Sequence, residues 1–136
     1  MEFQSAAEER GSTAGPSIER VIDLVHLSRM TLGDRALERE VLALFSRQAR
    51  LTLARIKHGP PEAVAAAAHT LKGAARGIGA HRVARAAEVV EHSGHPDRAD
   101  AVRALEGAVA EAGAVIEELL SPIDRMRSAI RRPEQP

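Results

Sequence analysis

The stretch VAAAAHTLKGAARGIGAHRVARAAEVVEHSG, residues 64–94, contains two alanine-rich runs in which apolar residues recur every three or four positions. This spacing is typical of helices with one apolar face, and alanine is the strongest helix former. Pro61 suits the first turn of a helix that we expect to run to about Gly77 or Gly79. A second helix is expected from about Ala80 to Ser93, with Gly94 placed to end it. The stretch therefore predicts two consecutive helices joined by a short turn.

Upstream, the sequence predicts one short and one long helix. Asp23 is a candidate N-cap for the short helix, which is expected to end near Gly33. Asp34 is a candidate N-cap for a helix of about 24 residues that stops at Gly59, where two prolines follow. The core positions expected on the long helix are Leu37, Val41, Leu44, Phe45, Thr52 and Ile56.

Downstream, apolar residues at alternating steps of three and four predict a helix from Val102 to Ile130. Pro122 interrupts this pattern, so either the helix is kinked there or Ser121 caps a new one. No segment alternates with the period of a strand. We therefore expect an all-α fold: an antiparallel four-helix bundle with a short extra N-terminal helix, in a domain over residues 18–132 after a flexible N-terminal leader over residues 1–17.

The composition excludes several classes of function. The 19 basic and 19 acidic residues balance, and there is no Trp or Tyr, which argues against nucleic-acid binding. The absence of cysteine excludes disulfides and thiolate metal sites. No apolar run is long enough to span a membrane, so we expect a soluble cytoplasmic protein. The excess of arginine over lysine, together with abundant alanine, suggests a bacterial source.

His69 falls on the side of its helix opposite the predicted core. With about 100° per residue and Leu71 at the centre of the core stripe, His69 lies about 160° away, next to Gly73 and Arg76, and Lys72 lies on the flank. The other residues expected in this core stripe are Val64, Ala67, Ala68, Ala74, Ala75 and Ile78.

An exposed imidazole with a clear approach can act as a nitrogen nucleophile. Histidine as a residue type titrates near neutral pH, so a neutral ring is available to carry a phosphoryl group. Lys72 and Arg76 could balance the added negative charge, and Gly73 leaves space one turn beyond the ring. The alternative is that His69 is an ordinary solvated residue and Gly73 a helix defect without function.

The motif HTLKGAARGIGA, residues 69–80, resembles the signature of histidine-containing phosphotransfer domains, and the similarity extends over residues of about 20 to 120. The resemblance implies that His69 is phosphorylated, that Lys72 is its charge partner, that Gly73 gives clearance and that Gly79 is the later glycine of the signature. Positions 74 and 75 carry alanine where the family often has small hydroxyl residues.

The resemblance implies a phosphorelay intermediate of two-component signalling that has no kinase domain and is not itself an enzyme. The expected partners are response-regulator receiver domains and a hybrid or sensor histidine kinase. We expect no cofactor on this chain, because the Mg²⁺ would be held by the acidic site of the partner receiver domain. We also expect a monomer that binds neither nucleic acid nor a membrane.

Three alternatives remain open from the sequence. The chain could be the phosphoacceptor module of a sensor kinase, although Thr70 follows the histidine where those domains have an acidic residue. It could be the phosphoacceptor module of a chemotaxis-type kinase, or a helical adaptor that is not phosphorylated. A metal site built from His92, His95 and Asp97 is disfavoured, because one short loop rarely completes a coordination shell.

A second apolar ridge on the long helix is a candidate partner-binding surface. Leu42, Ala49 and Leu53 lie about 80 to 120° from Val41, which is expected to face the core. The alternative is that these three residues pack against the short first helix.

Overall fold

The computed structural model describes residues 21–94 and 96–121, and this part of the chain is helical with no strand. The predicted all-α fold is confirmed. The expected leader over residues 1–17, the alternatives at Pro122 and the continuation of the last helix to Ile130 lie outside the described residues. The elements are α3 (Leu24–Met30), α4 (Arg35–His58), the 3-10 turn η1 (Pro61–Ala63), α5 (Val64–Ile78), α6 (His81–His92) and α7 (Arg98–Leu119).

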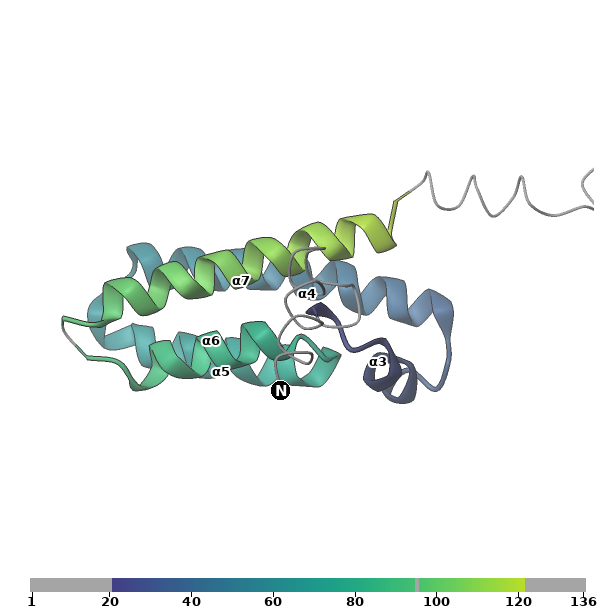
Figure 1. Ribbon diagram of the computed structural model, residues 1–136, viewed down its shortest axis with the longest axis horizontal. Coiled ribbons are helices and arrows are strands. Elements are labelled where there is room, and N and C mark those ends of the chain that lie inside the picture. Colours follow the sequence, from purple (N-terminus) through teal and green to yellow (C-terminus); the bar gives the residue numbers. More distant parts are fainter. Residues whose placement is uncertain (1–20, 95, 122–136) are drawn as a thin grey trace, which may run out of the picture.

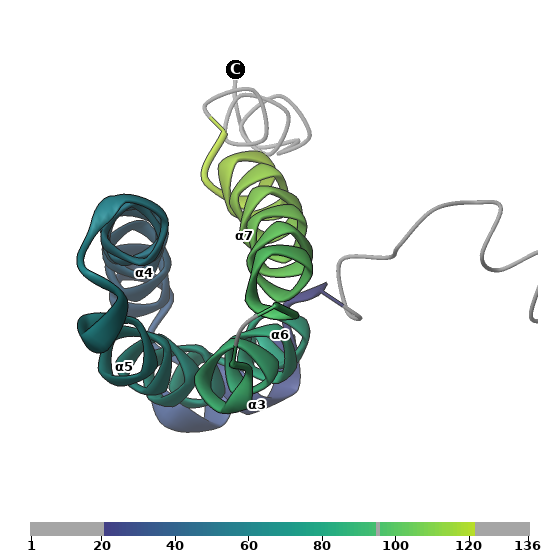
Figure 2. The same cartoon turned by 90° about the vertical axis from the view of Figure 1, so that its left-hand side faces the viewer.

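The four long helices form an antiparallel bundle (Figure 1). Viewed along their axes, they follow one another around a U in which α5 and α6 form the base and α4 and α7 form the two arms (Figure 2). The short α3 lies at one end of the bundle, against α5. This is the predicted four-helix bundle with a short extra helix at its N-terminal side.

The helix starts agree with the residues chosen from the sequence. Asp23 precedes α3, and its side chain accepts a hydrogen bond of 3.0 Å from the backbone N–H of His26. Asp34 caps α4 in the same way, with the N–H of Leu37 as donor. Each carboxylate satisfies a backbone donor that has no partner inside the helix and lies at the positive end of the helix dipole.

Gly79 makes the turn between α5 and α6. Its φ of +85° is left-handed, which is readily accessible only to a residue without a Cβ, and its carbonyl accepts the backbone N–H of Asp23 at 2.9 Å. A Cβ at this position would lie 2.9 Å from the carbonyl oxygen of Asp23. The turn thus needs glycine at position 79 for two reasons: the left-handed backbone angle, and the close approach of the chain segment that precedes α3.

The core of α5 is rotated relative to the sequence prediction. Val64, Ala68, Leu71, Ala75 and Ile78 are buried as expected. Ala74, however, is exposed and Ala67 is half-buried, so the prediction was wrong for Ala74. Lys72 is buried instead of lying on an open flank. The buried arc turns toward α6 because α6 packs closely along that side of α5.

The core face of α4 is also shifted. Phe45, Thr52 and Ile56 are buried as predicted, but Leu37 and Leu44 are exposed and Val41 is only half-buried. The core positions that replace them come from the ridge of Leu42, Ala49 and Leu53, for which the sequence predicts a partner-binding surface. The buried residues of α4 are Leu42, Phe45, Ala49, Thr52 and Ile56.

This shift corrects the predicted partner-binding surface. Leu42 and Ala49 are 4% and 2% exposed, so they cannot form an exposed docking ridge. Leu42 lines a hollow with Leu24 and Leu27 of α3, as the alternative expected. Leu53 is half-buried and, with Ala49, lines a groove against α7 rather than against α3.

Candidate functional site

His69 lies on the outer surface of α5, and its side chain is 66% exposed. The Nδ1 atom of its ring is 2.8 Å from Oε2 of Glu91 on α6. An ionised carboxylate can only accept hydrogen bonds, so Nδ1 carries the proton and donates it to Glu91. The other ring nitrogen, Nε2, then keeps its lone pair. The bond to Glu91 therefore fixes both the tautomer and the orientation of the ring.

Lys72 binds the other oxygen of the same carboxylate. Its Nζ lies 2.7 Å from Oε1 of Glu91, and the side chains of Lys72 and Glu91 are only 10% and 17% exposed. The lysine predicted to flank the histidine is thus almost covered, and its charge is matched by Glu91. Lys72 acts on His69 through Glu91, as a fixed support for the carboxylate that holds the ring.

The pKa of Glu91 is held below its ordinary value. The main cause is the Lys72 ammonium, and the hydrogen bond from His69 acts in the same direction, whereas partial burial opposes both. His92 is a third basic group near this carboxylate, with Nε2 4.0 Å from Oε1. Glu91 therefore stays ionised wherever the protein is near neutral pH.

Gly73 and Arg76 complete the surface around the ring. A Cβ built on Gly73 would meet no atom within 4 Å, so the backbone here borders open space. The guanidinium of Arg76 is 3.5 Å from Glu88 of α6, and its side chain is 56% exposed. This is a long, solvated contact of the kind that contributes little stability, so Arg76 can turn to another anion at small cost.

The structure brings His69, Lys72, Gly73 and Arg76 onto one side of α5, and Glu91 is the site residue that sequence reasoning missed. Two antiparallel helices that meet at a tight turn place residues at equal distances from the turn side by side. His69 and Glu91 are each eleven residues from Ala80. This pairing across the predicted turn was the signal that could have found Glu91.

Among residues 21–94 and 96–121, no group of three histidine, cysteine, aspartate or glutamate side chains is arranged to hold a metal ion. In the same part of the chain, no helix combines the length and the apolar character that crossing a membrane requires.

We expect Glu91→Gln to destabilise the fold near pH 7, because the amide loses the charge that Lys72 binds. The lowered pKa makes this contribution fully present above the ordinary glutamate value of 4.5 and removes it as the pH falls through the folded-state value. The stability gap between wild type and variant, measured by urea unfolding, should therefore be constant from pH 7 down to 4.5 and shrink as the pH falls further. Glu118→Gln, at an exposed position of α7, is the control. A gap of unchanged size at the acid end would contradict the assigned pairing.

A sequence model of the Hpt domain family matches residues 40–129, about two thirds of the chain. The matched range contains the α5 and α6 surface on which His69, Lys72 and Glu91 meet. No curated protein and no solved structure matches the chain. Hpt domains are phosphotransfer modules of two-component signalling, and the all-helical bundle agrees with that fold. The chain belongs to the Hpt domain family.

Proposed function

We propose that His69 is the phosphoacceptor of a phosphorelay, taking a phosphoryl group from the aspartyl phosphate of one receiver domain and passing it to the aspartate of another. The observation that carries this proposal is the tautomer set by Glu91. With Nδ1 bound at 2.8 Å and the side chain 66% exposed, Nε2 presents a lone pair to solvent. A nucleophile needs this combination of a fixed ring and an open reacting atom.

The transfer step balances without an external base. The Nε2 lone pair attacks the phosphorus atom, an N–P bond forms, and the P–O bond to the aspartyl carboxylate breaks with its electron pair on oxygen. Nδ1 keeps its proton, so the phosphorylated ring carries a positive charge. The Glu91 carboxylate, 2.8 Å from that N–H, stabilises this charge. The reverse step returns the phosphoryl group to a receiver aspartate.

The added negative charge needs donors close to the ring. Arg76 is the candidate on this chain that can move to it, because its contact with Glu88 is long and exposed. Lys72 remains with Glu91 and keeps the ring support in place. We assign the Mg²⁺ of the reaction to the acidic site of the partner receiver domain, where it would neutralise the transferring phosphoryl oxygens.

A stripe of leucines on α4 is the docking surface that we propose for the receiver. Leu37, Leu44 and Leu51 are spaced seven residues apart and are 40%, 49% and 54% exposed. They lie about 110° from the core direction of α4, on the same flank as Arg55. Arg55 in turn lines a groove with Ala66 and other residues of α5, so the stripe borders the face of α5 that carries the histidine.

No long side chain of α5 projects from the surface between the leucine stripe and His69. The residues of α5 that lie there have no side chain or short ones, namely Ala66, Thr70, Gly73, Ala74 and Gly77. A partner that rests on the leucines can therefore approach the ring without meeting a long side chain. Exposed leucines lower stability little, and their burial on binding yields about 25 cal/mol per Å² of apolar surface.

We expect the relay partners to include a hybrid or sensor histidine kinase, in a bacterial cytoplasm. Three incubations separate this role from the alternatives: with ATP alone, with phosphorylated receiver domains, and with a kinase plus ATP. Label from phosphorylated receivers supports the relay. Label only with a kinase favours a kinase phosphoacceptor module, label with ATP alone contradicts the absence of kinase activity, and no label favours an adaptor.

His69→Gln should accept no phosphoryl group from a phosphorylated receiver domain, while its circular dichroism and thermal midpoint stay close to those of wild type. The glutamine amide can still reach Glu91 but offers no nucleophilic nitrogen. His58→Gln, an exposed histidine at the end of α4, is the matched control and should be labelled normally. Acid-labile label that persists in the His69 variant would refute the assignment.

Gly73→Leu should keep or raise the stability of the fold while it slows phosphotransfer. Leucine is a better helix former than glycine by up to about 1 kcal/mol, and the position borders open space, so the fold should be as stable as wild type or more so. The side chain would project beside the ring, where a misplacement of about 1 Å can cost on the order of a hundredfold in rate. Gly107→Leu, in α7 and also facing open space, should gain stability and transfer normally. Equal transfer rates for the two variants would show that Gly73 has no steric role.

Leu51→Asp should weaken receiver docking without unfolding the protein, because the side chain is half exposed before the change. We expect the receiver concentration at half-maximal rate to rise about tenfold, which corresponds to a loss of about 1.4 kcal/mol in binding. Val89→Asp is the control, because Val89 is 56% exposed and shares a flank of α6 with Arg82, which pairs with α7. A tenfold effect from Val89→Asp and none from Leu51→Asp would place the docking surface elsewhere.

A further inference from the structure

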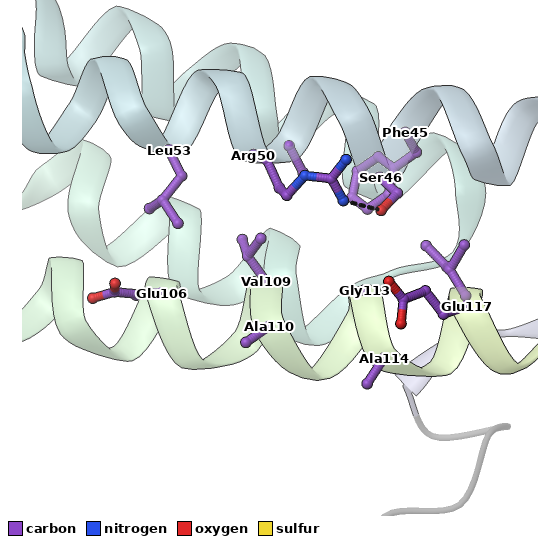
Figure 3. Close-up of a pocket in the computed structure, with 12 residues that line it drawn as sticks. Phe45, Ser46, Arg50, Leu53, Glu106, Val109, Ala110, Gly113, Ala114 and Glu117 are labelled. Carbon is purple, nitrogen blue, oxygen red and sulfur yellow. Dashed lines mark hydrogen bonds between the residues drawn. The ribbon is translucent and has the colours of Figure 1, made fainter.

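A groove lined by α4 and α7, the two arms of the U, lies on the side of the bundle away from α5 and α6. Figure 3 shows the residues that line it. Its volume is about 430 Å³, and its floor is apolar, with Phe45 and Ala49 of α4 facing Val109 and Ile116 of α7. No described element covers it. The proposed phosphotransfer chemistry does not use this groove.

Two opposite charges on facing walls of the groove do not meet. Arg50 lies on the α4 wall and Glu117 on the α7 wall, as Figure 3 shows. Arg50 donates to Ser46 of its own helix at 3.1 Å, and Glu117 forms no ion pair among the described residues. Toward the other end of the groove, Lys57 of α4 and Glu106 of α7 do form an ion pair, with Nζ 2.6 Å from Oε2. An arginine and a glutamate thus stay unmatched on facing walls.

We propose that this groove is the interface of a homodimer, with a second copy of the chain as its occupant. A two-fold axis parallel to the helices turns the second copy so that its α7 lies over α4 of the first and its α4 over α7 of the first. Each basic wall then faces an acidic wall. The groove is its own complement under this one operation, which is the requirement for an interface between identical copies.

The register along the helices favours the same arrangement. Within one copy, Ser46 and Glu117 line one end of the groove, and Leu53 and Glu106 line the other. Arg50 is therefore level with about Glu111, roughly one and a half helical turns from Glu117. Rotation about an axis parallel to the helices preserves these levels. The Arg50 of each copy would lie within reach of the partner copy's glutamate at the same position on α7, forming two equivalent ion pairs.

Small residues on α7 allow the two copies to approach closely. Ala110 and Ala114 are exposed, Gly113 is half-buried, and Leu53 on the opposite wall is half-buried. Leu53 of one copy would pack onto this small-residue surface of the other. The contact would then be apolar at its centre, with the charged pairs toward its edges, as in stable interfaces.

The area is sufficient for a dimer of moderate affinity. A helix of 22 residues is about 33 Å long, and two helices side by side are about 20 Å wide, which gives about 660 Å² on each copy. A standard interface buries about 800 Å² on each partner. His69 points out from the α5 and α6 side, so both phosphoacceptor sites of the dimer would stay accessible.

Charge reversal tests the two-fold arrangement. We expect wild type to sediment at twice 14.5 kDa at high micromolar concentration, and Arg50→Glu or Glu117→Arg alone to shift it to the monomer. An equimolar mixture of the two variants should recover the dimer, because each mixed dimer then forms one ion pair of reversed polarity and one ion pair of native polarity. Glu118→Arg, at the neighbouring exposed position outside the groove, should leave the dimer intact.

A monomeric wild type throughout the concentration range would overturn the proposal and support the monomer expected from the sequence. Dimerisation of both single variants at wild-type strength would also overturn it, as would a mixture that stays monomeric. Circular dichroism would establish that each variant is folded. Phosphotransfer by the monomeric variants should remain at the wild-type rate, so this test and the test of His69 fail independently.

Discussion

The register between α5 and α6 is the constraint on which the site depends. One carboxylate, that of Glu91, binds the ring of His69 and the ammonium of Lys72 at 2.8 and 2.7 Å. It can reach both only because the two helices meet at a turn that fixes their relative position along the axis. The left-handed Gly79 sets this turn and is held in place by the backbone of Asp23.

The same turn joins α3 to the hairpin of α5 and α6. Asp23 caps α3 with its side chain and binds the carbonyl of Gly79 with its N–H. His81, at the start of α6, adds a 3.3 Å contact to its carboxylate, and the pKa of Asp23 is lowered mainly by the N–H of His26. Local capping and hairpin geometry are therefore parts of one structure, and a change at the turn would move the whole of α6 relative to α5.

Local signals in the sequence were enough for most of the fold. Asp23, Asp34 and Gly59 mark helix ends by chemistry that acts within a few residues, and the structure has helix boundaries beside each of them. The register of α4 was harder. Its leucines at positions 37, 44 and 51 are as apolar as a core stripe but are exposed, and periodicity finds apolar faces without saying which one meets the other helices.

Some features of the site could likewise be predicted from the sequence, and others could not. The exposure of His69 and the open space at Gly73 follow from helix geometry within α5 alone, so they could be predicted. The burial of Lys72 and the role of Glu91 depend on α6, because Glu91 lies 22 residues after His69 in the sequence. From the sequence, Lys72 one turn from His69 is expected to be a free cation. In the structure its ammonium binds Glu91, and Glu91 holds the ring of His69. Pairing across a turn has to be counted explicitly before such a role becomes visible in a sequence.

The two sides of the U-shaped bundle differ in their packing and in their charged contacts. The base, formed by α5 and α6, is closed by tight alanine packing and carries fixed polar contacts at its surface, which suits a residue that must hold one orientation. The open side between α4 and α7 keeps a groove and unmatched charges, which suits reversible association. A bundle with one closed and one open side can therefore hold the exposed ring of His69 in one orientation while a separate surface remains available for binding.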